Sequence, residues 1–264
     1  MPVWFHIDHR YFVFGAFGVT ASIAIYSTYK LNSERRKRRQ ENVYESEKLV
    51  NEYLVFHYSS QSETLKYDFG PKDSLEFPRR CAELCLESFQ DGLAGRFEEV
   101  VGLDYSQAFV DVCNRLKADG QLEYFVQDEG DLDRSRASFI QGDACDLPTN
   151  LGTFGCVLAA NLICRLHSPF KFLNRLAGLV APGGILVITS PYTWLTQFTD
   201  KSTWLGGFQD KNGREVYGFD TLKKTLGPQF DLIKDVNMPF FIRETAHKNQ
   251  WSVAHATVWK RKQE

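Results

Sequence analysis

The chain has 264 residues, of which 43% are hydrophobic and 24% are charged, and its formal net charge is −2. This composition is typical of a globular protein and excludes a disordered or fibrous chain. The near-zero charge also excludes a general positive potential over the surface, so we expect no nucleic-acid partner.

Six cysteines occur, and their spacing predicts no metal site. None forms a CxxC pair, and no group of cysteines and histidines has the spacing of zinc ligands. Cys81 and Cys85 stand four residues apart and share one face of a helix, an arrangement that two metal ligands can use. The favoured interpretation is that the cysteines are small buried residues in a reducing, cytosol-like compartment.

Residues 11–29 form an uncharged stretch of about the length needed to cross a membrane as a helix. Such a helix would span about 28 Å, close to the hydrocarbon thickness. The basic run over 35–39 follows this stretch, whereas a cleaved signal peptide carries its positive charge before it. We therefore predict a short tail over 1–10, a transmembrane anchor over 11–29 and a basic juxtamembrane linker over 30–43. The positive-inside rule then puts the folded domain of this single-pass membrane protein on the cytosolic side. The alternative is a helix that packs on a partner or lies in the membrane interface.

From residue 44 to residue 264, helical and strand-like segments alternate. The predicted helices cover 44–58, 79–89, 106–118 and 169–180, and the predicted strands cover 99–104, 137–140, 154–160, 185–189, 230–236 and 252–259. This alternation predicts an α/β domain with a mostly parallel sheet and helices on both faces. The last two strands have no long helix between them, which favours an antiparallel strand at the sheet edge.

Ligands of such a sheet bind beyond the carboxyl ends of its strands, so the residues that end the strands are informative. Asp104 ends VVGLD, where a carboxylate can accept hydrogen bonds from both ribose hydroxyls of a nucleotide; otherwise it caps the next helix. Asp143, in GDA, can accept from an adenine amino group while Ala144 lines the ring, or it is a turn residue. Asn161 follows FGCVLAA and is placed to contact the substrate or a cofactor.

These positions fit one class of enzyme as a set. An acidic residue after the second strand, GDA after the third and PGG before the fifth match class I methyltransferases, which have a Rossmann-like fold and use S-adenosylmethionine. The cofactor-binding residues are then predicted to be Asp104, Tyr105, Gly142, Asp143, Ala144 and Asn161. Gly183 and Gly184 are expected to be structural, because glycine tolerates positive φ in the turn before the last parallel strand.

Most of the chain from residue 44 onward resembles one methyltransferase family more closely. The stretches that carry the resemblance are YESEKLVNEYLVFHY, FPRRCAELCLES, EEVVGLDYSQAFVD, GDACDLP, LAANLICRL, APGGILVITSPYTWL and MPFFIRETAHKNQWSVAHATVWKR. They resemble the C-terminal methyltransferase domain of ovothiol-biosynthesis enzymes, the 4-mercaptohistidine N-methyltransferase family. The resemblance implies methyl transfer from S-adenosylmethionine to an imidazole nitrogen of a thiolated histidine. The sulfoxide-synthase region of those enzymes has no counterpart before the domain here, where we predict an anchor.

A small-molecule methyl acceptor of this kind gives roles to residues near the C-terminus. The candidates are Tyr192 and His247 for catalysis, and Trp194, Arg243, Trp251 and His255 for acceptor binding. Arg243 can bind a carboxylate bidentately, and His247 can act as a base. The alternatives are that Trp251 and His255 only pack in an edge strand, and that Arg243 belongs to a solvated surface pair with Glu244.

One part of the class I pattern is not found. A first strand ending in a DxGxxxG turn is expected between 79–89 and 99–104, but SFQDGLAGRFEEV has no apolar strand before Gly92 and Gly95. About 25–30 residues are missing relative to a strand–turn–helix unit, so we expect a sheet without its central strand. The alternative function is therefore a catalytically inactive, membrane-tethered binding or scaffold protein. A nucleotide-dependent oxidoreductase is disfavoured, because it too needs a glycine-rich turn.

Overall fold

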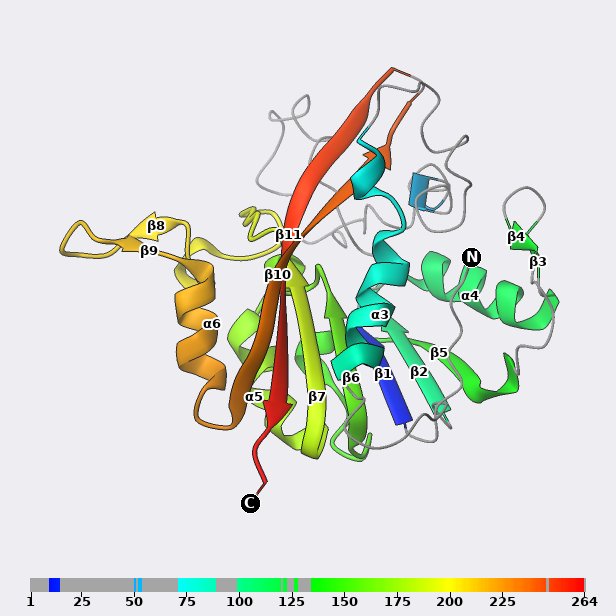
Figure 1. Ribbon diagram of the computed structural model, residues 1–264, viewed down its shortest axis with the longest axis horizontal. Helices are drawn as coiled ribbons and strands as arrows, with labels where there is room; N and C mark the ends of the chain where they lie inside the picture. Colours follow the sequence, from blue (N-terminus) through cyan, green and yellow to red (C-terminus); the bar gives the residue numbers. More distant parts are fainter. Residues whose placement is uncertain are drawn as a thin grey trace, which may run out of the picture.

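A mixed, seven-stranded sheet forms the centre of the fold in the computed structural model (Figure 1). The structure describes residues 10–14, 50, 52–53, 71–88, 99–119, 121–122, 126–127, 134–245 and 247–263. In spatial order the strands are β10 (Phe230–Arg243), β11 (Asn249–Arg261), β7 (Val180–Ser190), β6 (Phe154–Ala160), β1 (Arg10–Phe14), β2 (Glu99–Asp104) and β5 (Ala137–Gln141). The five strands from β7 to β5 are parallel, whereas β11 is antiparallel to both β7 and β10. The predicted Rossmann-like α/β fold is confirmed, but the antiparallel strand β11 lies one strand in from the edge, which β10 forms.

Helices and two short hairpins surround this sheet. The α-helices are α3 (Phe77–Ser88), α4 (Gln107–Asp119), α5 (Pro169–Arg175) and α6 (Gly218–Leu226). The 3-10 helices are η3 (Lys72–Ser74), η4 (Arg134–Arg136), η5 (Ala144–Asp146), η6 (Ile163–Arg165), η7 (Leu176–Gly178) and η8 (Lys201–Thr203). The hairpins pair β3 (Gln121–Leu122) with β4 (Val126–Gln127), and β8 (Phe208–Gln209) with β9 (Glu215–Val216). In the predicted helix 44–58, residues 50 and 52–53 are helical and the others lie outside the described residues.

The two faces of the sheet carry separate hydrophobic clusters, as expected for parallel strands covered on both sides. Along β6, Val157 and Ala159 face the cluster formed with α5 and α6, whereas Cys156, Leu158 and Ala160 face the cluster formed with α3. This alternation follows from the two-residue period of a strand. All six cysteines are buried and free, which confirms the interpretation that they serve as small core residues.

An inner position of the sheet, between β6 and β2, is occupied by the N-terminal strand β1. Its residues pair in parallel with β2 on one side and with β6 on the other, for example Val13 with Gly102 and with Leu158. The expectation of a sheet without a central strand is therefore wrong. A strand from another part of the sequence supplies the backbone donors and acceptors that β2 and β6 need.

The predicted transmembrane helix over 11–29 does not begin as expected, because residues 11–14 are strand residues of β1. Residues 15–29 lie outside the described part of the chain. Among the described residues, no helix has the length and apolar character that crossing a bilayer requires.

The PGG segment is part of a strand and is not the turn that the sequence suggested. Phe154 pairs with Val180 and Cys156 pairs with Ile185, so the residues between Val180 and Ile185 bulge out of the β6–β7 ladder. Gly183 has φ +76°, as predicted for a glycine. Gly184 has no room for a side chain, because a Cβ there would lie 2.7 Å from the carbonyl oxygen of Gly155. The predicted helix 169–180 is shorter than expected. The helix α5 ends at Arg175, the 3-10 helix η7 follows it, and residue 180 already belongs to β7.

Replacing Val13 with proline tests the position of β1. Proline cannot donate a ladder hydrogen bond and is not tolerated inside a sheet, so it should destabilise an inner strand. We expect Val13→Pro to lower the urea midpoint of the full chain, measured by circular dichroism. Val13→Thr is the matched control, since it keeps the N–H group and the β-branched shape. An unchanged midpoint for Val13→Pro would place β1 outside the sheet, where an anchoring segment tolerates proline.

Candidate functional site

The predicted cofactor-binding residues lie at one edge of the sheet. Asp104 ends β2, Asp143 follows β5 and Asn161 follows β6, and these three strands are parallel. The Gly142 N–H donates to the Asp104 carbonyl oxygen at 2.9 Å, which joins the ends of β5 and β2. The strand β1 lies between β2 and β6, so Asp104 and Asn161 are two strands apart. The common edge is as predicted, and the meeting of the three side chains around one ligand stays a prediction.

Asp104 has a structural contact of its own. Its Oδ1 accepts a hydrogen bond from the Ser106 N–H at 2.7 Å, and the residue is only 9% exposed. The Ser106 hydroxyl accepts from the Phe109 N–H at 3.4 Å, which makes Ser106 the N-cap of α4 as predicted. Asp104 therefore holds the turn that leads from β2 into α4. Its contact with a ribose stays a prediction. Tyr105 is 60% exposed beside it and offers an aromatic face to solvent.

Asn161 is the most constrained residue of this edge. It is 1% exposed and has φ +49°, in the left-handed region that non-glycine residues rarely adopt. Its N–H donates to the carbonyl oxygen and to Oγ1 of Thr189, both at 2.9 Å, and its Oδ1 accepts from Thr189 Oγ1 at 3.1 Å. Its Nδ2 is buried and has no hydrogen-bond partner among the described residues. A buried amide donor without a partner is costly, so this atom fits an acceptor atom of a ligand.

A second polar group lies at the neighbouring strand end, after β7. The Tyr192 hydroxyl lies 3.3 Å from His255 Nδ1, and His255 Nε2 lies 2.9 Å from Asp235 Oδ2. A carboxylate only accepts hydrogen bonds, so His255 Nε2 donates and, in the neutral ring, Nδ1 accepts from Tyr192. Tyr192 and His255 were predicted from the sequence, whereas Asp235 was not. The pairing of β10 with β11 brings Asp235 to His255.

The surroundings of Tyr192 hold it in one position. It has φ +51°, its N–H donates to Ser190 Oγ at 3.0 Å, and its ring packs against Gly218. Phe219 contacts the His255 ring edge-on, with 4.5 Å between the ring centroids. Burial raises the pKa of the Tyr192 phenol above its usual value, with a smaller contribution from the negative charge of Asp235. The phenol therefore keeps its proton at neutral pH.

Of the other predicted acceptor-side residues, Trp194 donates its backbone N–H to the Tyr192 carbonyl oxygen at 3.1 Å, whereas Arg243, His247 and Trp251 are not gathered around Tyr192. His247 is exposed in the turn between β10 and β11, next to Arg243. Six strand residues, or about 20 Å, separate this end of β11 from His255. Trp251 lies on the same outer half of the hairpin and donates its indole N–H to Ser74 Oγ at 2.7 Å. Trp194 is buried and stacks on Trp204, with 6.5 Å between the ring centroids.

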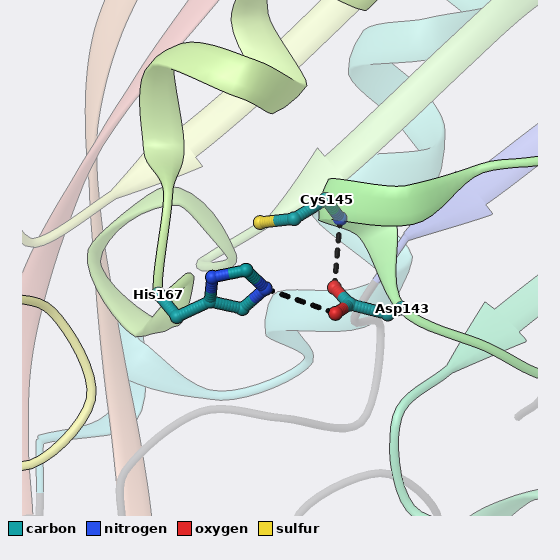
Figure 2. Close-up of side chains that lie close together, drawn as sticks. All are labelled: Asp143, Cys145 and His167. Atoms are coloured by element: carbon teal, nitrogen blue, oxygen red, sulfur yellow. Dashed lines mark hydrogen bonds and ion pairs between the residues drawn. The ribbon is translucent and has the colours of Figure 1, made fainter.

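A third polar group lies beside the predicted adenine position, and it was not predicted from the sequence. Figure 2 shows Asp143, Cys145 and His167 turned toward one another. Asp143 Oδ2 lies 2.9 Å from His167 Nε2, and Asp143 Oδ1 accepts from the Cys145 N–H at 2.8 Å. His167 comes from the segment before α5, and spacing alone does not relate it to GDAC.

The central part of the chain matches a known family. Residues 85–188 match the family described as methyltransferase domain. The match supports the methyltransferase class that the sequence predicted, with S-adenosylmethionine as its cofactor. The matched residues include the strand ends at Asp104, Asp143 and Asn161.

Several solved structures resemble the chain at low identity. The [4+2]-cyclase SpnF is 12% identical with a TM-score of 0.47, over 81% of this chain and 92% of that chain. The N-methyltransferase NodS from Bradyrhizobium japonicum WM9, in complex with S-adenosyl-L-homocysteine, is 16% identical with a TM-score of 0.43, over 80% and 98%. A protein from the conversion of a disulfide bond into a thioacetal group during echinomycin biosynthesis is 17% identical with a TM-score of 0.42, over 62% and 66%. At these values the similarities support no conclusion about function.

The bonds between Thr189 and Asn161 can be tested by removing one hydroxyl. Thr189→Val leaves Asn161 Oδ1 buried without its donor, so we expect a loss of about 1–3 kcal/mol in the free energy of unfolding. The measurement is urea denaturation of the full chain. Thr203→Val is the control, because the Thr203 hydroxyl bonds to Asp200 in an exposed position and its loss should change stability by about 0.5 kcal/mol or less. Equal effects of the two variants would contradict the role of the Thr189 hydroxyl.

Proposed function

We propose that this protein transfers a methyl group from S-adenosylmethionine to an imidazole nitrogen of a small molecule related to thiolated histidine. The observation that carries the proposal is the buried Asn161 amide, which offers an unused donor at the carboxyl edge of the sheet. The family match supports methyl transfer, and the long resemblance to 4-mercaptohistidine N-methyltransferases supports the acceptor class.

The residues at the sheet edge suit the binding of the methyl donor. When bound, S-adenosylmethionine supplies an already activated methyl group, so the protein contributes mainly orientation. The Asn161 amide can donate to a carboxylate of the bound molecules, and Asp104 and Asp143 can accept from ribose and adenine groups. Tyr105 and Ala144 provide flat or aromatic surface next to these two carboxylates.

Tyr192, His255 and Asp235 suit the handling of a proton. An imidazole attacks through the nitrogen that has a free lone pair, and its other nitrogen carries hydrogen. The Tyr192 oxygen can accept this N–H while its own proton moves to His255 Nδ1, and Asp235 then stabilises the imidazolium of His255. In this arrangement Tyr192 takes the catalytic role predicted for it, while His255 serves as the base that His247 was expected to be.

A catalytically inactive binding or scaffold protein is the second candidate. It is favoured by the segment between α3 and β2, which lacks the DxGxxxG pattern of an S-adenosylmethionine-binding turn. Residues 89–98 of this segment lie outside the described residues. Cofactor binding separates the two candidates directly.

Attachment to a membrane, with the folded domain on the cytosolic side, remains a proposal from the apolar and basic runs in residues 11–39. It competes with the pairing of β1, since residues 11–14 cannot lie in the sheet and in a bilayer at once. The comparison of Val13→Pro with Val13→Thr distinguishes these two positions.

Calorimetric titration of the full chain with S-adenosyl-L-homocysteine tests the proposed cofactor site. We expect micromolar affinity for the wild-type chain and a loss of about tenfold or more in Asn161→Ala, because a hydrogen bond to a charged group is worth about 1.5–3 kcal/mol. Asn174→Ala, on an exposed position of α5, is the matched control. No binding at millimolar ligand would support the scaffold protein instead.

A methylation assay with thiolated and plain histidine derivatives tests the acceptor and the proton path. We expect Tyr192→Phe to lower kcat by about 10²-fold or more, since a positioned acid–base group contributes about 10²–10⁴. The affinity for S-adenosyl-L-homocysteine should be unchanged. Tyr217→Phe, at an exposed tyrosine, is the control. Full activity of Tyr192→Phe would remove Tyr192 from the reaction, and activity on none of the acceptors would refute the proposed substrate class.

A further inference from the structure

We propose that Asp143, Cys145 and His167 bind one transition-metal ion, with Zn²⁺ as the best fit. The ligand atoms are Asp143 Oδ2, Cys145 Sγ and His167 Nε2, and the potential ligand atoms of the three residues lie within 4.8 Å of one another. Figure 2 shows that the thiol and the imidazole lie on the same side of the Asp143 carboxylate. This inference does not rest on the proposed methyl transfer, with which the site shares only Asp143.

The backbone around the three side chains is already held in place. The Asp143 carboxylate accepts from the Cys145 N–H and so fixes the turn η5, while Cys145 Sγ donates to the Ser168 carbonyl oxygen at 3.4 Å. This second bond ties η5 to the segment that carries His167. In the ion-free protein these bonds hold η5 and the segment of His167 close together, and a bound ion would replace the thiol bond as the link between them.

The set of donor atoms selects the kind of ion. One thiolate, one imidazole and one carboxylate suit Zn²⁺ and exclude Ca²⁺ and Mg²⁺, which prefer oxygen ligands. Bond lengths of about 2.0–2.3 Å to a tetrahedral Zn²⁺ put the ligand atoms roughly 3.3–3.8 Å apart. The observed cluster needs only a small contraction, and the His167 side chain is 61% exposed and free to rotate toward the ion. Three protein ligands leave a fourth position open to solvent.

Binding must release a proton, because the ligand is the thiolate. Burial raises the pKa of Cys145 to about 11, so the thiol is protonated at neutral pH. The charged groups around it are Asp143, His167 and the pair of Lys171 with Asp146, whose atoms lie 3.1 Å apart. As Zn²⁺ binds, the thiol proton goes to buffer and His167 carries its single proton on Nδ1.

Titration of the chelator-treated full chain with ZnCl₂ tests the site. We expect one ion per chain by calorimetry, with a heat that depends on the buffer because a proton is released. Co²⁺ should give a thiolate-to-metal absorption band in the near ultraviolet. Cys145→Ser should abolish this band, and His167→Ala should lower Zn²⁺ affinity at least about tenfold. The exposed side chain of His167 makes its variant safe for folding, which keeps the test valid if Cys145→Ser is unstable.

Two control variants separate this site from adventitious binding. Cys113→Ser changes another buried, free thiol, and His247→Ala changes a histidine in an exposed turn. Neither should alter Zn²⁺ affinity. Absence of binding, unchanged affinity in His167→Ala, or equal losses in the control variants would overturn the proposal.

Discussion

The contact between Thr189 and Asn161 joins the ends of the two central strands β7 and β6, and the candidate site depends on it. A single threonine hydroxyl accepts from the Asn161 N–H and donates to its side-chain oxygen in a fully buried place. This pairing holds Asn161 in a left-handed conformation that costs of order 1–3 kcal/mol. It also leaves the amide nitrogen as the one polar atom of that side chain without a partner in the described part of the chain.

The neighbouring strand end repeats this feature. Tyr192 is left-handed as well, and its backbone N–H donates to Ser190 Oγ. Non-glycine residues in this region are uncommon, and strained residues gather where the surrounding structure gains a function from them. Asn161 therefore offers a buried donor and Tyr192 offers a hydroxyl from adjacent strands. The two residues with a strained backbone are therefore the same two that offer polar groups at this edge of the sheet.

The sequence predicted those parts of the fold whose signals are local. The strand at 154–160 was predicted with its observed bounds, because its apolar run ends in turn residues on both sides. The strand β10 continues past 236 through Pro239, which usually breaks a strand but is tolerated at a sheet edge. The strand β1 was missed although its sequence RYFVF is rich in strand-favouring residues, because the uncharged stretch over 11–29 was interpreted as a membrane helix. Its pairing also depends on partners far along the chain.

The same limit applies to the candidate site. Asp104, Asp143 and Asn161 were predicted because strand ends are recognisable and a parallel sheet brings them to one edge. Asp235 and His167 were missed, because their contacts with His255 and Asp143 arise from pairing and packing between separate segments. His247 was predicted to act as a base, but it lies in the turn of the β10–β11 hairpin, and the length of that hairpin cannot be known before its register is known.

The position of β1 also governs how the sheet assembles. Tyr11 pairs with Cys156, so more than half of the chain lies between two strands that are adjacent in space. Contacts this remote form slowly, because the entropy of closing so large a loop is lost before the pairing is gained. Until that closure occurs, β2 and β6 present open backbone edges, and such edges can pair with other chains and begin aggregation. The yield of refolded protein should therefore depend on chain concentration and on the integrity of the first fifteen residues.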